Sequence, residues 1–139
     1  MLNFAEKCLE DYPVNLARLD VLTQDYQSNP SDKLETEINS LRSMTQPLQK
    51  MIDDLSSNEK IDNILSQDML TVLGTCYFGR NSINAILEMT GWSRAKLFRR
   101  KNNLIKLAAD YLADYFQMET AESARSVKED IEYRELNPN

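Results

Sequence analysis

The sequence contains no histidine, and its two cysteines, Cys8 and Cys76, lie far apart with no Cys-x-x-Cys spacing. Zinc sites use closely spaced cysteine and histidine ligands, so we expect no metal and no cofactor. Free, buried thiols of a reducing compartment are the expected state of both cysteines. A glycine-rich phosphate loop and a nucleophile beside a base are missing as well, so we do not expect the protein to be an enzyme.

Glycine and proline are scarce, with three and four residues among 139. A β fold rich in turns needs more of both, and strict alternation of apolar and polar residues is hard to find. Hydrophobic residues make up 42% of the chain, which is enough for a core. The composition therefore predicts an all-α protein of one compact unit with flexible ends.

Long apolar runs are absent too. No stretch approaches the roughly 20 apolar residues of a membrane span, and the first residues show no basic segment followed by an apolar one. We therefore expect a cytoplasmic protein without a membrane partner.

The N-terminal part predicts two short helices. Leu2 to Tyr12 has apolar residues on one side, and Pro13 should end this helix because proline lacks an amide donor. A second helix is expected from Val14 or Asn15 to Tyr26. After a break, Ser31 is placed to cap the N-terminus of a third helix.

The third helix carries a heptad-like seam, in which Thr45 lies among apolar residues spaced by four and three: Leu34, Ile38, Leu41, Leu48, Ile52 and Leu55. This seam has two equally favoured interpretations. It is either the face of an amphipathic helix packed on its own domain, or a coiled coil that forms a dimer or higher homo-oligomer. Pro47 should either kink one long helix or start a new one with Thr45 as its cap.

A further helix is expected from Lys60 to Phe78, with Gly79 as a left-handed terminator. Residues after Phe116 are polar and acidic and predict a tail or frayed helix. We therefore expect three regions: a helical, oligomerising region over 1–57, a DNA-binding domain over 58–117 and an acidic, flexible tail over 118–139.

The segment from Asn81 to Leu107 predicts a helix-turn-helix. Asn81 or Ser82 can cap its first helix, Gly91 supplies the positive φ of a tight turn, and Ser93 can cap the second helix. Ile86 and Leu97 are expected to face each other across the turn. The inward stripe of the second helix should continue through Leu104, Ala108 and either Tyr111 or Leu112.

Basic residues gather in this second helix although the whole chain has a net charge of −6. Six of the sixteen basic residues fall in a stretch of 13 residues without an acid: Arg94, Lys96, Arg99, Arg100, Lys101 and Lys106. A basic recognition helix with an apolar inner face is the arrangement that enters the major groove of double-stranded DNA. The alternative is a helical hairpin with a solvated basic face.

The expected base-facing positions are Ser93, Arg94, Ala95, Phe98 and Arg99. The expected phosphate contacts are Lys96, Arg100, Lys101, Asn102 and Lys106. Phe98 has two interpretations, contact with a thymine methyl group or burial beside Leu97, and the second is slightly favoured.

Residues 70–116, with Cys76-Tyr77-Phe78-Gly79 leading into Thr90-Gly91-Trp92-Ser93, resemble sigma factor region 4, which reads the −35 promoter element. Together with Tyr12-Pro13 near the start, the sequence resembles the RinA/ArpU-type late-gene activators of phages that infect Gram-positive bacteria. This resemblance implies DNA binding upstream of a late operon and recruitment of host RNA polymerase. It also implies base reading by Ser93, Arg94 and Arg99. The sequence departs from the sigma pattern at Leu87, where a small alanine is usual, and in its acidic tail.

The leading interpretation is therefore a sequence-specific transcriptional activator. One alternative is a phage DNA-packaging protein like a small terminase subunit, although such proteins usually carry the DNA-binding element earlier in the chain. Another is a protein-interaction module that binds RNA polymerase or a sigma factor through Leu34 to Leu55.

Overall fold

The computed structural model describes residues 2–57 and 63–135, with side chains as far as Phe116. Within these ranges all regular secondary structure is helical and there is no strand, which confirms the all-α prediction. Its elements are α1 (Leu2–Ser28), α2 (Asp32–Ser57), α3 (Asn63–Val72), the π-helical segment η1 (Leu73–Phe78), α4 (Ile83–Thr90) and α5 (Arg94–Glu135). None of the described helices is both long and apolar enough to cross a membrane.

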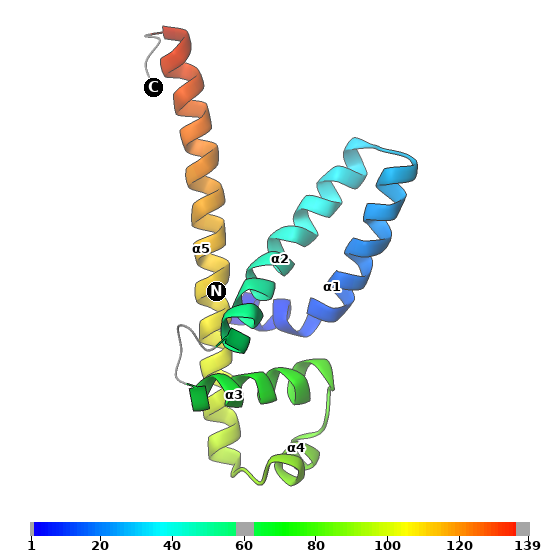
Figure 1. Ribbon diagram of the computed structural model, residues 1–139, viewed down its shortest axis with the longest axis vertical. Helices are drawn as coiled ribbons and strands as arrows, with labels where there is room; N and C mark the ends of the chain where they lie inside the picture. Colours follow the sequence, from blue (N-terminus) through cyan, green and yellow to red (C-terminus); the bar gives the residue numbers. More distant parts are fainter. Residues whose placement is uncertain (1, 58–62, 136–139) are drawn as a thin grey trace.

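Helix α1 continues through Pro13, so the prediction that Pro13 ends a first helix is wrong. Packing of the residues that precede the proline explains why the helix persists. Leu9 and Tyr12 are buried before it, and the Tyr12 hydroxyl donates to Gln49 Oε1 of α2 at 2.6 Å. Proline interrupts the backbone ladder and bends a helix, and the first turns of α1 run in a different direction from the rest (Figure 1).

Helix α2 is likewise one helix through Pro47, so the proline does not start a new one. Thr45 is not a cap, because its hydroxyl donates back to the Leu41 carbonyl at 2.9 Å. At the start of α2, Ser31 Oγ accepts from the Leu34 amide at 3.2 Å, which confirms the predicted cap. Helices α1 and α2 pack side by side as an antiparallel hairpin (Figure 1).

The heptad-like seam of α2 is used inside the chain. Leu48 and Leu55 belong to the central core, and Ile38 and Leu41 are buried along the hairpin. Leu34 is half-buried, and Ile52 packs against the core from its edge. In the structure the seam packs on other helices of the same chain, and four of its six side chains are buried without a second copy.

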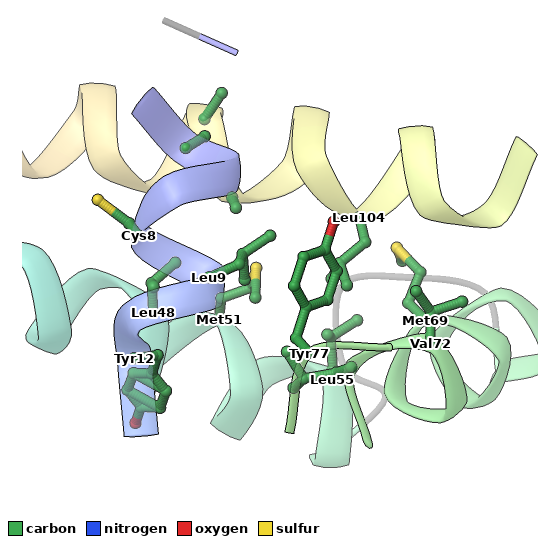
Figure 2. Packing of buried hydrophobic residues seen from close by; sticks show 14 of the residues in the cluster. Cys8, Leu9, Tyr12, Leu48, Met51, Leu55, Met69, Val72, Tyr77 and Leu104 are labelled. Atoms are coloured by element: carbon green, nitrogen blue, oxygen red, sulfur yellow. The ribbon is translucent and has the colours of Figure 1, made fainter. Parts of the chain in front are cut away.

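The core unites both halves of the chain. Leu9 of α1, Leu48, Met51 and Leu55 of α2, Val72 of α3 and Leu104 of α5 belong to one cluster, which Figure 2 shows between the helices. The boundary expected between residues 57 and 58 is therefore not a boundary between two cores. The N-terminal hairpin and the helix-turn-helix share one hydrophobic interior.

Helix α5 is 42 residues long, and its predicted inward stripe is confirmed. Leu97, Leu104, Ala108 and Leu112 are all buried, whereas Tyr111 is half-buried. The helix continues across residue 117 to Glu135, so the expected tail is helical as far as it is described, and residues 136–139 lie outside the description. Figure 1 shows α5 as a rod that extends beyond the other helices.

The segment before α4 departs from prediction at Gly79. The expected helix from Lys60 is described from Asn63 and ends in the π-helical η1. Gly79 has a φ of −80°, and Arg80 takes the left-handed conformation with a φ of 50°. A side chain at Gly79 would lie 2.9 Å from the Gly74 carbonyl oxygen, so this glycine meets a demand for space and not for positive φ.

The shared core can be tested with Leu9→Ala, which removes a side chain that is 1% exposed. We expect a loss of about 2–5 kcal/mol in the free energy of unfolding. Trp92, the sole tryptophan, reports on the helix-turn-helix, and circular dichroism reports on all helices. In Leu9→Ala, the unfolding midpoints from Trp92 fluorescence and from circular dichroism should fall together. Leu16→Ala, at a half-exposed position of the same helix, should lower the free energy of unfolding by less than about 1 kcal/mol. An unchanged Trp92 midpoint in Leu9→Ala would show that the two halves fold independently.

Candidate nucleic-acid interface

Helix α4 and its turn are held by short-range hydrogen bonds. Ser82 Oγ accepts from the Ala85 amide at 3.2 Å and caps the helix. Gly91 has a φ of 71°, and its amide donates to the Leu87 carbonyl at 2.8 Å. The hydroxyl of Thr90 then accepts from the Trp92 amide at 3.2 Å. The predicted roles of Ser82 and Gly91 are confirmed.

The second helix of the motif begins directly after this turn. Ser93 Oγ accepts from the Lys96 amide at 3.1 Å, so Ser93 is the predicted N-cap of α5. Ile86 and Leu97 are each 2% exposed and lie in the same core cluster. Leu87 is half-buried and packs against that cluster, so the larger residue is accommodated. The motif therefore consists of α4, a three-residue turn and the start of α5.

One face of α5 is exposed along its first four turns. Successive residues of an α-helix are rotated by about 100°, so these positions fall within an arc of about 140°. We call them the exposed stripe: Arg94, Ala95, Phe98, Arg99, Asn102 and Lys106. Four of the five predicted base-facing residues, Arg94, Ala95, Phe98 and Arg99, lie here, and the fifth, Ser93, is the exposed N-cap residue just before the helix. Phe98 is 42% exposed, so the interpretation that it is a core residue is wrong.

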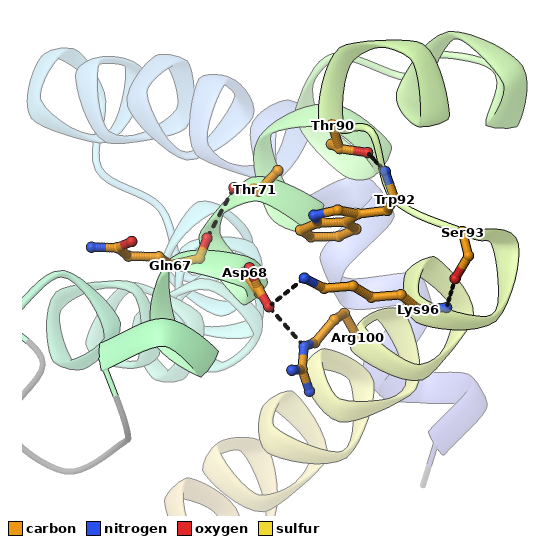
Figure 3. Close-up of polar contacts among 8 residues, drawn as sticks. All are labelled: Gln67, Asp68, Thr71, Thr90, Trp92, Ser93, Lys96 and Arg100. Atoms are coloured by element: carbon orange, nitrogen blue, oxygen red, sulfur yellow. Dashed lines mark hydrogen bonds and ion pairs between the residues drawn. The ribbon is translucent and has the colours of Figure 1, made fainter.

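Three of the six clustered cations do not lie on this stripe. Lys96 and Arg100 lie on the flank of α5 that faces α3, where they meet Asp68. Lys96 Nζ is 3.5 Å and Arg100 Nε is 2.9 Å from Asp68 Oδ2 (Figure 3). Lys96 also lies over the Trp92 ring, with Nζ 4.7 Å from the centroid. The sequence placed both residues at phosphates, and the fold pairs both with a carboxylate.

Lys101 lies on the opposite flank and is paired as well. Its Nζ is 3.5 Å from Glu6 Oε2 of α1 and 5.8 Å from the centroid of the Tyr77 ring. The Tyr77 hydroxyl donates to the same Glu6 oxygen at 3.0 Å. Burial and the Glu6 carboxylate raise the pKa of Tyr77 above its ordinary value, so this hydroxyl stays protonated. The three groups join α1, η1 and α5.

The exposed cations of the cluster are therefore Arg94, Arg99 and Lys106. Arg94 donates to Asn84 Oδ1 at 3.2 Å, which links the start of α5 to α4. Asp68 and Glu6 were not predicted from the sequence, and they lie 28 or more positions before the cations they meet. No local spacing signals these pairs, because they arise from the packing of α3 and α1 against α5.

The cysteines take no part in this surface. Burial, with the Asp11 carboxylate, raises the pKa of the Cys8 thiol to about 11, and burial also raises the pKa of Cys76. Both thiols therefore stay protonated near neutral pH and are poor nucleophiles. Among the described residues, no three side chains of histidine, cysteine, aspartate or glutamate come close enough to hold a metal ion.

Comparisons with known proteins found no family model, no curated protein and no solved structure that matches this chain.

The turn can be tested by substitution at Gly91. A Cβ atom there would meet nothing within 4 Å, so Gly91→Ala should cost only the backbone strain of a positive φ, about 1–2 kcal/mol in unfolding free energy. Gly91→Asn should cost less, because asparagine tolerates the left-handed region. Urea unfolding followed by Trp92 fluorescence measures both losses. Equal losses for the two variants would contradict the assignment to backbone conformation.

Proposed function

We propose that this protein binds double-stranded DNA by placing the exposed stripe of α5 in the major groove. The observation that carries the proposal is the stripe itself, which combines Arg94 and Arg99 with Phe98 on one face of a capped helix after a three-residue turn. The opposite face of the same helix is buried, so the stripe is fixed relative to α4 and α3.

The chemistry of the stripe fits the edges of base pairs. Arginine binds guanine O6 and N7 bidentately, and apolar groups such as Ala95 and Phe98 can contact the methyl group of thymine. Lys106 and Asn102 lie further along the helix and would contact phosphates. From residue 94 to residue 106 the helix is about 20 Å long, which is enough to follow the groove past its rim.

We further propose that the chain acts as a sequence-specific transcriptional activator of phage late genes in the cytoplasm of a bacterial host. The resemblance of its sequence to the RinA/ArpU-type activators supports this assignment. The hairpin of α1 and α2 projects away from α4 (Figure 1), so it would remain accessible to RNA polymerase while α5 is on DNA. Exposed Val14 and Val21 lie on that hairpin.

The base-reading role can be tested with Arg99→Ala and Arg94→Ala on a duplex selected from a random pool. Each substitution should weaken binding to the selected sequence by about 1–3 kcal/mol, because a bidentate contact to guanine is lost. Arg42→Ala, an exposed arginine on α2, removes the same charge outside the motif and should change affinity little. Fluorescence anisotropy of the labelled duplex gives the affinities.

Arg94 needs one further control, because it also contacts Asn84. Asn84→Ala removes that contact and retains the arginine, so it separates positioning from base reading. Unchanged affinity in both arginine variants would overturn the recognition-helix assignment. Light scattering on the same preparation decides against the packaging alternative unless a ring of eight or more subunits is found.

A further inference from the structure

We propose that Asp68 lowers the sequence-independent DNA affinity of this protein by keeping Lys96 and Arg100 away from phosphates. The inference rests on the proposed DNA-binding function and deepens it. It starts from an observation that local sequence does not reveal: two of the six cations of the recognition helix share one carboxylate oxygen of α3.

The position of the two cations makes them natural phosphate ligands. They are one turn apart on the flank of α5, next to the exposed stripe, where the backbone of a bound duplex would pass. Without a partner, two such cations would add two phosphate contacts to any complex, whatever the DNA sequence. Asp68 meets both of them instead, at 3.5 Å and 2.9 Å (Figure 3).

The pairing is hard for DNA to displace because it is partly buried. The Asp68 side chain is 14% exposed, and those of Lys96 and Arg100 are 33% and 21% exposed. Solvent and salt screen such pairs less than exposed ones. Moving either cation to a phosphate would leave a largely buried carboxylate with one partner fewer, which costs free energy. Trp92 holds the Lys96 side chain on the same flank.

The pairing with Asp68 affects phosphate contacts and leaves base contacts unchanged. Arg94 and Arg99 stay exposed and available to base edges, whereas two of the cations suited only to phosphates are occupied. Sequence-independent binding consists almost entirely of phosphate contacts, so the loss of two affects it most. Asp68 therefore acts on the affinity for random DNA through Lys96 and Arg100, without contacting DNA itself.

The test measures the affinity of Asp68→Asn for a labelled random-sequence duplex over a salt series. If two phosphate contacts are gained, the slope of log K against log salt steepens by about 1.8. The ratio of the variant's DNA affinity to that of wild type should then be about tenfold larger at about 50 mM salt than at about 200 mM salt. Asp20→Asn is the matched control, since Asp20 is an exposed aspartate of α1 and its loss changes the net charge equally. It should leave the slope unchanged.

A triple variant, Asp68→Asn with Lys96→Gln and Arg100→Gln, closes the cycle and should return the slope to the wild-type value. Circular dichroism melts verify folding. Two single variants in the wild-type background test the inference without relying on the stability of Asp68→Asn. Lys96→Gln should leave the slope of log K against log salt unchanged, because Lys96 makes no phosphate contact. Lys106→Gln should make the slope shallower by about 0.9, because one phosphate contact is lost.

The outcomes separate the two proposals. If wild type binds DNA and Asp68→Asn behaves as Asp20→Asn does, or binds more weakly, Asp68 only positions the helix and this inference is overturned. A gain that persists in the triple variant overturns it as well. If neither wild type nor Asp68→Asn binds any duplex at low salt, the proposed function itself fails.

Discussion

The inward stripe of α5 is the contact on which the rest of the structure depends. Leu97, Leu104, Ala108 and Leu112 form the side of the core against which α1, α2 and α3 all pack. The same helix carries the exposed stripe on its other face, so the apolar contacts that stabilise the fold also fix the orientation of Arg94 and Arg99. A helix that is anchored along four turns cannot rotate to present other side chains, since rotation would expose the buried leucines.

This dependence explains which features the sequence could predict. The caps at Ser31, Ser82 and Ser93 and the turn at Gly91 were predicted correctly, because each is formed by atoms within four residues of one another. The buried stripe of α5 was also predictable from its spacing. Interactions of short range leave a signature in local sequence, and helical periodicity is one of them.

The errors arose where tertiary packing outweighs a local rule. Pro13 should end a helix by its chemistry, yet the burial of Leu9 and Tyr12 against neighbouring helices keeps α1 continuous. Gly79 was expected to supply positive φ, and the structure uses it because η1 leaves no room for a side chain. The heptad seam was ambiguous for the same reason, since its spacing is identical whether the covering helix belongs to this chain or to another.

The charges at the start of α5 show the same division. The sequence predicted DNA contacts for all six cations in these 13 residues, two at bases and four at phosphates. The fold divides them by what faces them: Lys96 and Arg100 meet Asp68, Lys101 meets Glu6, and Arg94, Arg99 and Lys106 stay exposed. A net charge of −6 opposes DNA over most of the surface, so under the proposed function a favourable approach requires an orientation that presents these three cations. In such a protein, affinity for DNA depends less on how many basic residues the helix has than on how many of them the fold leaves exposed and without an acidic partner.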